Sequence, residues 1–198
     1  MWILSPDLHR IVEPIQVESI VKDASGTVIG SSIQRTTYKQ WTTDLVLPEY
    51  LRSLKGTASS STTMENQVVF YSYDDKGNPL EVSKVNGMRI VYIWGYNKTQ
   101  PIAKIENATY SDVSSYVSAL QLASDNGSLS ESSFSSLRSN LSNAMITTFI
   151  YKPLIGVSSI TDPKGDTVYY EYDELNRLKY IKDAQGNLLS ENQYKYKN

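Results

Sequence analysis

The chain has 198 residues and a formal net charge of −2, with about 40% apolar and 20% charged residues. This size suits one domain or two small ones, and the composition is that of a globular protein able to bury a core. The scattered basic residues argue against nucleic-acid binding, no apolar run is long enough to span a membrane, and the lack of cysteine excludes disulfides and thiol chemistry.

The first part of the chain, residues 1–54, predicts an N-terminal hairpin region. A turn is expected at Asp23–Gly26, where an aspartate is followed three residues later by glycine. Residues 45–54 are ambiguous, and Pro48 argues against a central strand there because proline has no backbone N–H to donate. The polar stretch 55–66 predicts a flexible loop.

The stretch 67–106 predicts a pair of β-hairpins. Apolar and aromatic residues alternate from Val68 to Tyr73 and lead into a turn from Asp74 to Gly77. A second turn is signalled by Asn86–Gly87, a pair that favours a type I′ turn because both residues tolerate a positive φ.

The stretch 107–144 predicts a helical insertion, with a helix pair at about 111–143. Each helix would have about 13 residues. Ser111 or Asp112 would cap the first helix, and Ser130 would cap the second. The apolar residues at helical spacing are Val113, Tyr116, Val117, Leu120, Ala123, Phe134, Leu137 and Leu141.

The last part, residues 145–198, predicts further hairpins with three closely spaced Asp turns. An aspartate at the first turn position can accept hydrogen bonds from backbone N–H groups two residues on. Glycine or asparagine at the fourth position can adopt the positive φ that such a turn needs. Across the chain, the turn-forming residues of the repeats are Asp74, Gly77, Asp162, Gly165, Asp173, Asn176, Asp183 and Gly186.

One segment resembles a known repeat. The run from Tyr170 to Leu178, YEYDELNRL, followed by Lys182–Leu188, is similar to the YD repeat of the RHS family, and Tyr71–Leu80 is a second copy. The sequence of the C-terminal segment is similar to that of the RHS-repeat proteins of Bacteroidetes-type bacteria. The chain resembles a fragment of such a protein with few repeats. The resemblance implies a β-hairpin scaffold from a large exported protein, whose longer members form a shell around a toxic domain.

The expected fold class is α+β and mostly β. Antiparallel YD-repeat β-hairpins would form a twisted sheet, interrupted by the inserted helix pair. An extracellular or cell-surface location follows from the resemblance, with any export signal outside this chain. A short array of hairpins leaves unpaired edge strands, so the expected partners are the rest of the parent repeat protein or another copy of the chain.

The expected function is a non-catalytic structural repeat module of an exported or cell-surface RHS/YD-repeat protein, as part of a toxin-delivery or interbacterial-competition shell. The sole histidine, His9, has no recognisable acidic partner, and the repeated aspartates are explained as turn formers, so we expect no catalytic residue, metal or cofactor. The alternative is an adhesin module that binds a glycan or a surface protein through exposed aromatics. Its candidate contacts are Tyr92, Trp94, Tyr96, Tyr170, Tyr172 and Tyr180.

Overall fold

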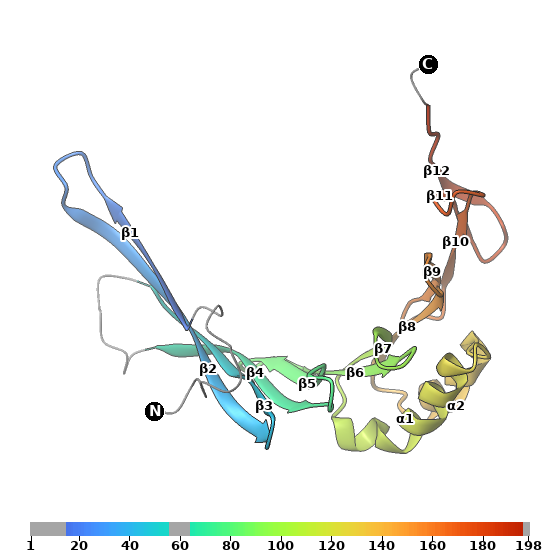
Figure 1. The fold of residues 1–198 in the computed structure, drawn as a ribbon, viewed down its shortest axis with the longest axis horizontal. Coiled ribbons are helices and arrows are strands. Elements are labelled where there is room, and N and C mark those ends of the chain that lie inside the picture. Colours follow the sequence, from blue (N-terminus) through green and yellow to red (C-terminus); the bar gives the residue numbers. More distant parts are fainter. Residues whose placement is uncertain (1–14, 56–63, 196–198) are drawn as a thin grey trace. The chain divides into compact units, whose positions relative to one another are not determined.

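The computed structural model describes residues 15–55 and 64–195 (Figure 1). The chain divides into two compact units, Met1–Arg89 and Ile90–Asn198. The described residues form twelve strands, two α-helices and one 3-10 helix, η3. The elements are β1 Gln16–Lys22, β2 Val28–Thr42, β3 Leu45–Lys55, β4 Glu65–Tyr73, β5 Pro79–Lys84, β6 Arg89–Gly95, β7 Gln100–Glu106, α1 Tyr110–Asp125, η3 Glu131–Phe134, α2 Ser135–Asn140, β8 Met145–Lys152, β9 Gly156–Thr161, β10 Thr167–Tyr172, β11 Leu178–Asp183 and β12 Leu188–Glu191.

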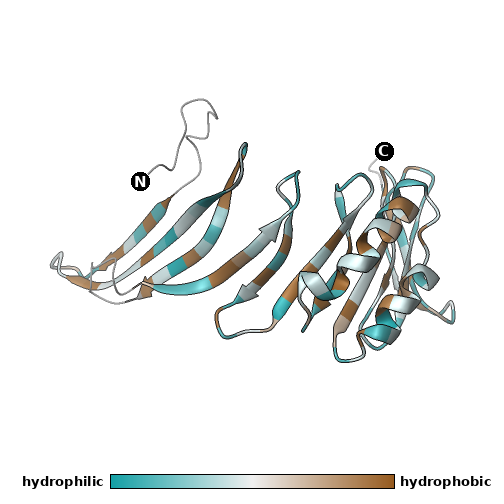
Figure 2. Ribbon diagram, turned by 90° about the horizontal axis from the view of Figure 1, so that it is seen from below, coloured by the Kyte–Doolittle hydropathy of each residue, from teal (hydrophilic) through white to brown (hydrophobic). Residues whose placement is uncertain are grey.

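The fold class predicted from the sequence is confirmed. In both units the strands follow one another in chain order, and the paired strands are antiparallel. Polar and apolar residues alternate along many strands, which is the pattern that lets the two faces of a sheet differ (Figure 2). The two units divide after Arg89, inside the stretch 67–106 that the sequence analysis predicts as one hairpin region.

The first unit contains a strand where the sequence argued against one. β3 pairs with β2 on one side and with β4 on the other, so the argument from Pro48 against a central strand is wrong. Pro48 is tolerated because it lies at a shift of register: Thr37 pairs with Tyr50, but Tyr38 pairs with Pro48. Its missing N–H also lies outside the part of β3 that pairs with β4, which begins at Tyr50.

The turn between β5 and β6 is not the type I′ turn that Asn86–Gly87 suggested. The N–H of Gly87 donates to the carbonyl of Lys84 at 3.0 Å, so Val85 and Asn86 are the central residues of the turn. Asn86 has a φ of 57°, and Gly87 does not have a positive φ. The turn moves by one residue because Val85 N donates to Gln67 O, which extends the pairing of β4 with β5.

The second unit holds the hydrophobic core. The helical insertion between β7 and β8 packs against one face of β6, β7 and β8, which brings apolar side chains of both layers together. The core residues are Val91, Ile93, Ile102, Ala103, Ile105, Ala108, Val113, Val117, Leu120, Leu129, Phe134, Leu137 and Ile146.

The helical insertion has the predicted apolar face but different ends. The first helix is capped by Thr109, not by Ser111 or Asp112: Asp112 instead accepts from the backbone N–H of Thr109 at 2.8 Å, completing a capping box. Ser130 caps the second helical segment as expected. That segment is split into η3 and a six-residue α2, shorter than the predicted helix, because its many serines form local hydrogen bonds that compete with a regular helix.

Two predictions fall on parts of the chain that lie outside the described residues. The flexible loop was expected over 55–66, and residues 56–63 are not described; on either side, β3 runs to Lys55 and β4 begins at Glu65. His9 is also outside the described residues.

Candidate functional site

Aspartate turns close five of the hairpins, and Asp173 shows their geometry. Its N–H donates to Arg177 O and its carbonyl accepts from Asn176 N, both at 2.9 Å. Its carboxylate Oδ1 accepts from the N–H groups of Leu175 and Arg177, again at 2.9 Å. Asn176 has a φ of 58°, in the left-handed region, and this conformation lets the chain leave the turn and enter β11.

The same arrangement recurs four more times. In each turn the aspartate carbonyl accepts from the glycine three residues on, and Oδ1 accepts from the N–H groups two and four residues on at 2.8–3.0 Å. The glycines have φ between 83° and 94°. These turns begin at Asp23, Asp74, Asp162 and Asp183 and contain Gly26, Gly77, Gly165 and Gly186.

The second carboxylate oxygen is also used inside the turn in three cases. Asp173 Oδ2 accepts from Arg177 Nε at 2.8 Å, and Asp183 Oδ2 accepts from Asn187 Nδ2 at 2.8 Å. The Arg177 side chain lowers the pKa of Asp173, and the Asn187 side chain lowers that of Asp183. Asp74 Oδ2 accepts in the same way from Asn78. The carboxylates therefore act within their own turns rather than converging on a shared site.

Tyrosine hydroxyl groups tie neighbouring strands together. Tyr73 at the end of β4 donates to the carbonyl of Pro48 on β3 at 3.0 Å, and Tyr172 at the end of β10 donates to Val157 on β9 at 2.9 Å. Burial raises the pKa of both hydroxyls, so they stay protonated donors. Tyr73 and Tyr172 directly precede Asp74 and Asp173, so one Tyr–Asp pair supplies both an interstrand bond and a turn.

The six aromatic residues proposed as contacts do not share one face. Tyr92 and Trp94 lie together on β6, with ring centroids 6.4 Å apart. Tyr170 pairs with Ile181, whereas Tyr180 pairs with Glu171, so Tyr180 lies on the opposite face of the sheet from Tyr170. Tyr172 shares the face of Tyr170. All six are half-buried: Tyr92, Trp94, Tyr96, Tyr170, Tyr172 and Tyr180.

The sixth candidate, Tyr96, begins an unusual backbone segment. Tyr96, Asn97 and Lys98 have φ of 52°, 58° and 62°, three successive residues in the left-handed region. Such a conformation costs about 1–3 kcal/mol for each non-glycine residue, so the surroundings must hold it. The C-terminal end of α1 does so: Ser124 Oγ accepts from Tyr96 N at 3.0 Å, and Asp125 Oδ1 accepts from Asn97 N at 2.6 Å.

The close approach of α1 to this segment depends on Gly95. A Cβ at this position would lie 2.9 Å from Ser124 Cβ and 2.8 Å from Ile102 Cγ2. Both neighbours belong to buried side chains, so neither can move aside. Tyr96 is fixed at its other end as well, because its hydroxyl donates to Tyr151 O at 3.2 Å and accepts from Tyr151 N at 3.0 Å.

Comparisons with known proteins give matches among solved structures alone. No protein-family model matches the sequence, and no curated protein sequence matches it. The chain is similar to a crystal structure of TcdB2-TccC3-TEV, with 12% identity, a TM-score of 0.45 and coverage of 87% of this chain and 9% of that one. The crystal structure of TcdB2-TccC3 without its hypervariable C-terminal region has 11% identity and a TM-score of 0.46, and the match covers 88% of this chain and 9% of that one. A Tc holotoxin pore from Photorhabdus luminescens has 11% identity and a TM-score of 0.43, with the same coverage of 88% and 9%.

A polar network beneath the helical insertion was missed by sequence reasoning. Arg138 on α2 donates through Nε to Glu131 at 2.8 Å and through Nη2 to Thr148 Oγ1 at 3.1 Å. Its Nη1 donates to the carbonyls of Ile146 and Asp162 at 2.9 and 3.2 Å. No local pattern signals this cluster, because its members come from a helix, a strand and a turn that only the fold brings together.

Within residues 15–55 and 64–195, no group of three or more His, Cys, Asp or Glu side chains is placed to hold a metal ion. Over the same residues, no helix combines the length and the apolar character needed to cross a membrane.

Proposed function

We propose that the chain is a non-catalytic structural module of a larger RHS/YD-repeat protein, which is exported or displayed at the cell surface. The module would form part of a shell used in toxin delivery or in competition between bacteria. The export and the shell rest on the resemblance of the Tyr170–Leu178 segment to the YD repeat.

The structural role is supported by one observation: the repeated polar side chains form hydrogen bonds within the fold. Five aspartates close turns with one geometry, and hydroxyls of strand-end tyrosines bond the neighbouring strand. Groups that satisfy one another in this way hold hairpins in register and are not available for a reaction. An adhesin built on one aromatic row has less support, because Tyr170 and Tyr180 lie on opposite faces.

Free strand edges indicate the kind of partner. Among the described strands, β1 and β12 each have one hydrogen-bonded neighbour. Both also expose apolar side chains, Val17 and Ile20 on β1 and Leu188 and Leu189 on β12. An unpaired edge is a template for another strand, so the partner is a further hairpin of the parent protein or a second copy of the chain.

A proline at the free edge of β12 tests this proposal. The N–H of Asn192 donates to Lys179 O on β11 at 2.9 Å, so the N–H of Glu191 points away from β11 because these groups alternate. We expect the wild-type chain to associate with rising concentration in size-exclusion chromatography with light scattering. Glu191→Pro should shift the mass toward the monomer, because it removes an outward donor while the bonds to β11 remain.

The matched control places the same substitution in a turn. Glu174 occupies the turn position that Pro163 occupies in the preceding repeat, so Glu174→Pro fits the backbone and should associate like the wild type. A strict monomer at every concentration, or association that Glu191→Pro leaves unchanged, would show that the module does not join its neighbours through this edge.

A further inference from the structure

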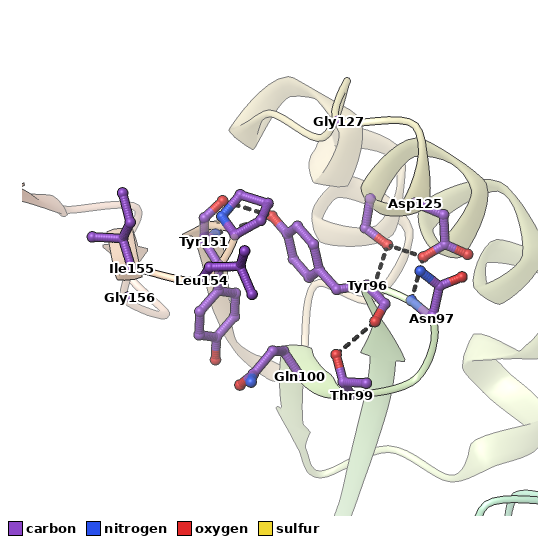
Figure 3. Close-up of a pocket in the computed structure, with 12 residues that line it drawn as sticks. Tyr96, Asn97, Thr99, Gln100, Asp125, Gly127, Tyr151, Leu154, Ile155 and Gly156 are labelled. Atoms are coloured by element: carbon purple, nitrogen blue, oxygen red, sulfur yellow. Dashed lines mark hydrogen bonds between the residues drawn. The ribbon is translucent and has the colours of Figure 1, made fainter. Parts of the chain in front are cut away.

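A cavity of about 580 Å³ lies in the second unit beside the left-handed segment. Its walls come from the β6–β7 loop, the end of α1 and the β8–β9 loop, and its residues include Tyr96, Gln100, Asp125, Tyr151 and Leu154 (Figure 3). The volume is within the range of small-molecule sites. The turn and interstrand hydrogen bonds described above give this cavity no structural role.

One wall of the cavity is a rigid aromatic surface. The ring of Tyr96 lies at the centre of the lining residues in Figure 3 and packs edge to face with Tyr151, with ring centroids 5.5 Å apart. The Tyr96 hydroxyl and backbone are both held, by Tyr151 and by Ser124. Leu154 at the rim is fully exposed and has a φ of 64°, so an apolar side chain is held out into solvent by a strained backbone.

The lining of the cavity also includes polar groups that make few bonds within the fold. Asp125 uses Oδ1 to accept from Asn97 N, while its Oδ2 has no partner within the described residues. The side-chain amides of Asn97 and Gln100 likewise make no hydrogen bond to the part of the chain that the structure describes. These groups offer both donors and acceptors to a ligand.

We propose that this cavity binds a neutral sugar residue of a glycan. A sugar ring presents an apolar C–H face that packs on an aromatic ring, and hydroxyl groups that bond amides and carboxylates. Asp125 is the sole charged side chain of the lining, and its negative charge disfavours phosphorylated or acidic ligands. This site is separate from the structural role proposed above and stands without it.

A peptide strand fits the cavity less well. β7 is paired with both β6 and β8, and β8 is paired with both β7 and β9. No free edge of these two strands is therefore available to a peptide backbone, which is the usual source of affinity when a sheet binds an extended peptide.

Nuclear magnetic resonance titration of the whole chain tests the proposal. The probes are maltotriose, cellotriose and chitotriose, each added to about 10 mM because single-site sugar affinities are weak. At least one should shift the backbone amide signals of Tyr96, Asn97 and Tyr151. Gln100→Ala should weaken that binding about fivefold through the loss of one hydrogen bond. Gln185→Ala, a change of the same exposed residue type in a distant turn, should leave it unchanged.

Three results would overturn the proposal. The first is the absence of shifts with all three sugars. The second is binding that Gln100→Ala does not weaken, or shifts confined to residues away from the cavity. The third is that an arginine- or lysine-containing tripeptide shifts these amides while the sugars do not, which would assign the cavity to a basic peptide. None of these results bears on edge association, which is measured by mass.

Discussion

At the scale of single residues, the Tyr–Asp pair makes two kinds of contact at the end of a strand. The Tyr172 hydroxyl bonds to the carbonyl of Val157 on the neighbouring strand, and the Asp173 carboxylate holds the next four residues in a turn. A net hydrogen bond contributes about 0.5–1.5 kcal/mol, and bonds to a charged group contribute more. Because the aspartate bonds are made to the ionised carboxylate, the turns should respond to acid.

The first prediction concerns pH. The pKa values of Asp173 and Asp183 are lowered in the folded chain, so their stabilising effect is complete above their unfolded pKa and is lost as pH falls through the lower folded value. We expect the melting temperature, followed by circular dichroism, to fall steeply below about pH 4. The double variant Asp173→Asn with Asp183→Asn should show a smaller fall.

The control for this prediction is Asp44→Asn. Asp44 is an exposed carboxylate in the turn between β2 and β3, and it accepts no hydrogen bond from the described residues. This variant should keep the wild-type response to acid. An acid response equal in the wild type and the double variant would mean that the turn carboxylates do not govern acid stability.

At the scale of elements, the helical insertion is attached to the sheet by both an apolar face and a polar network. Phe134 and Leu137 are fully buried against the strands. Between them and the β9–β10 turn, Arg138 bridges Glu131, Thr148 and the carbonyl of Asp162. A polar network of this kind favours one orientation of the insertion, because each of its partly buried groups bonds to a specific partner.

The second prediction is that Arg138→Met destabilises the chain. The substitution retains much of the side-chain volume but breaks the ion pair with Glu131, which keeps its bond from Thr148, and removes the donor to the carbonyls of Ile146 and Asp162. Because both charged side chains are partly exposed, we expect a loss of about 1–2 kcal/mol in the free energy of unfolding. Urea denaturation measures it. In a double-mutant cycle with Glu131→Gln, the two losses should be less than additive. Strictly additive losses would show that the two side chains act independently.

At the scale of the whole molecule, the buried apolar residues are distributed unevenly between the two units. The core cluster lies entirely within the second unit. In the described part of the first unit, Ile33 is the one buried apolar residue, with 6% of its surface exposed. Because burial of apolar surface is the main stabilising contribution, the second unit should be the more stable of the two.

The third prediction follows from this distribution. Backbone amides of β6, β7 and β8 should exchange hydrogen roughly 100-fold more slowly than those of β1 and β2, since the hairpins of the first unit can open without exposing a core. Hydrogen exchange followed by mass spectrometry measures this difference. Equal protection in both units would show that the hairpins of the first unit unfold only together with the core.

How far the sequence predicts the molecule depends on the range of the interaction. The turns at Asp74, Asp162, Asp173 and Asp183 are set by residues within five positions of one another, so local chemistry is sufficient to place them. The face of α1 was predicted from its period for the same reason. The type I′ turn expected at Asn86–Gly87 does not form, because Val85 bonds to Gln67 on β4, and that contact is not local.

The sequence by itself determined the β-hairpin class, the repeated Asp turns and the presence of a helical insertion, because period and turn chemistry are local properties. The tertiary structure alone decided which residues meet across the strands. Register placed Tyr170 and Tyr180 on opposite faces, and packing of α1 brought Ser124 and Asp125 against Tyr96 and Asn97. Such contacts join residues 28 positions apart in the chain, a separation that no local pattern can specify.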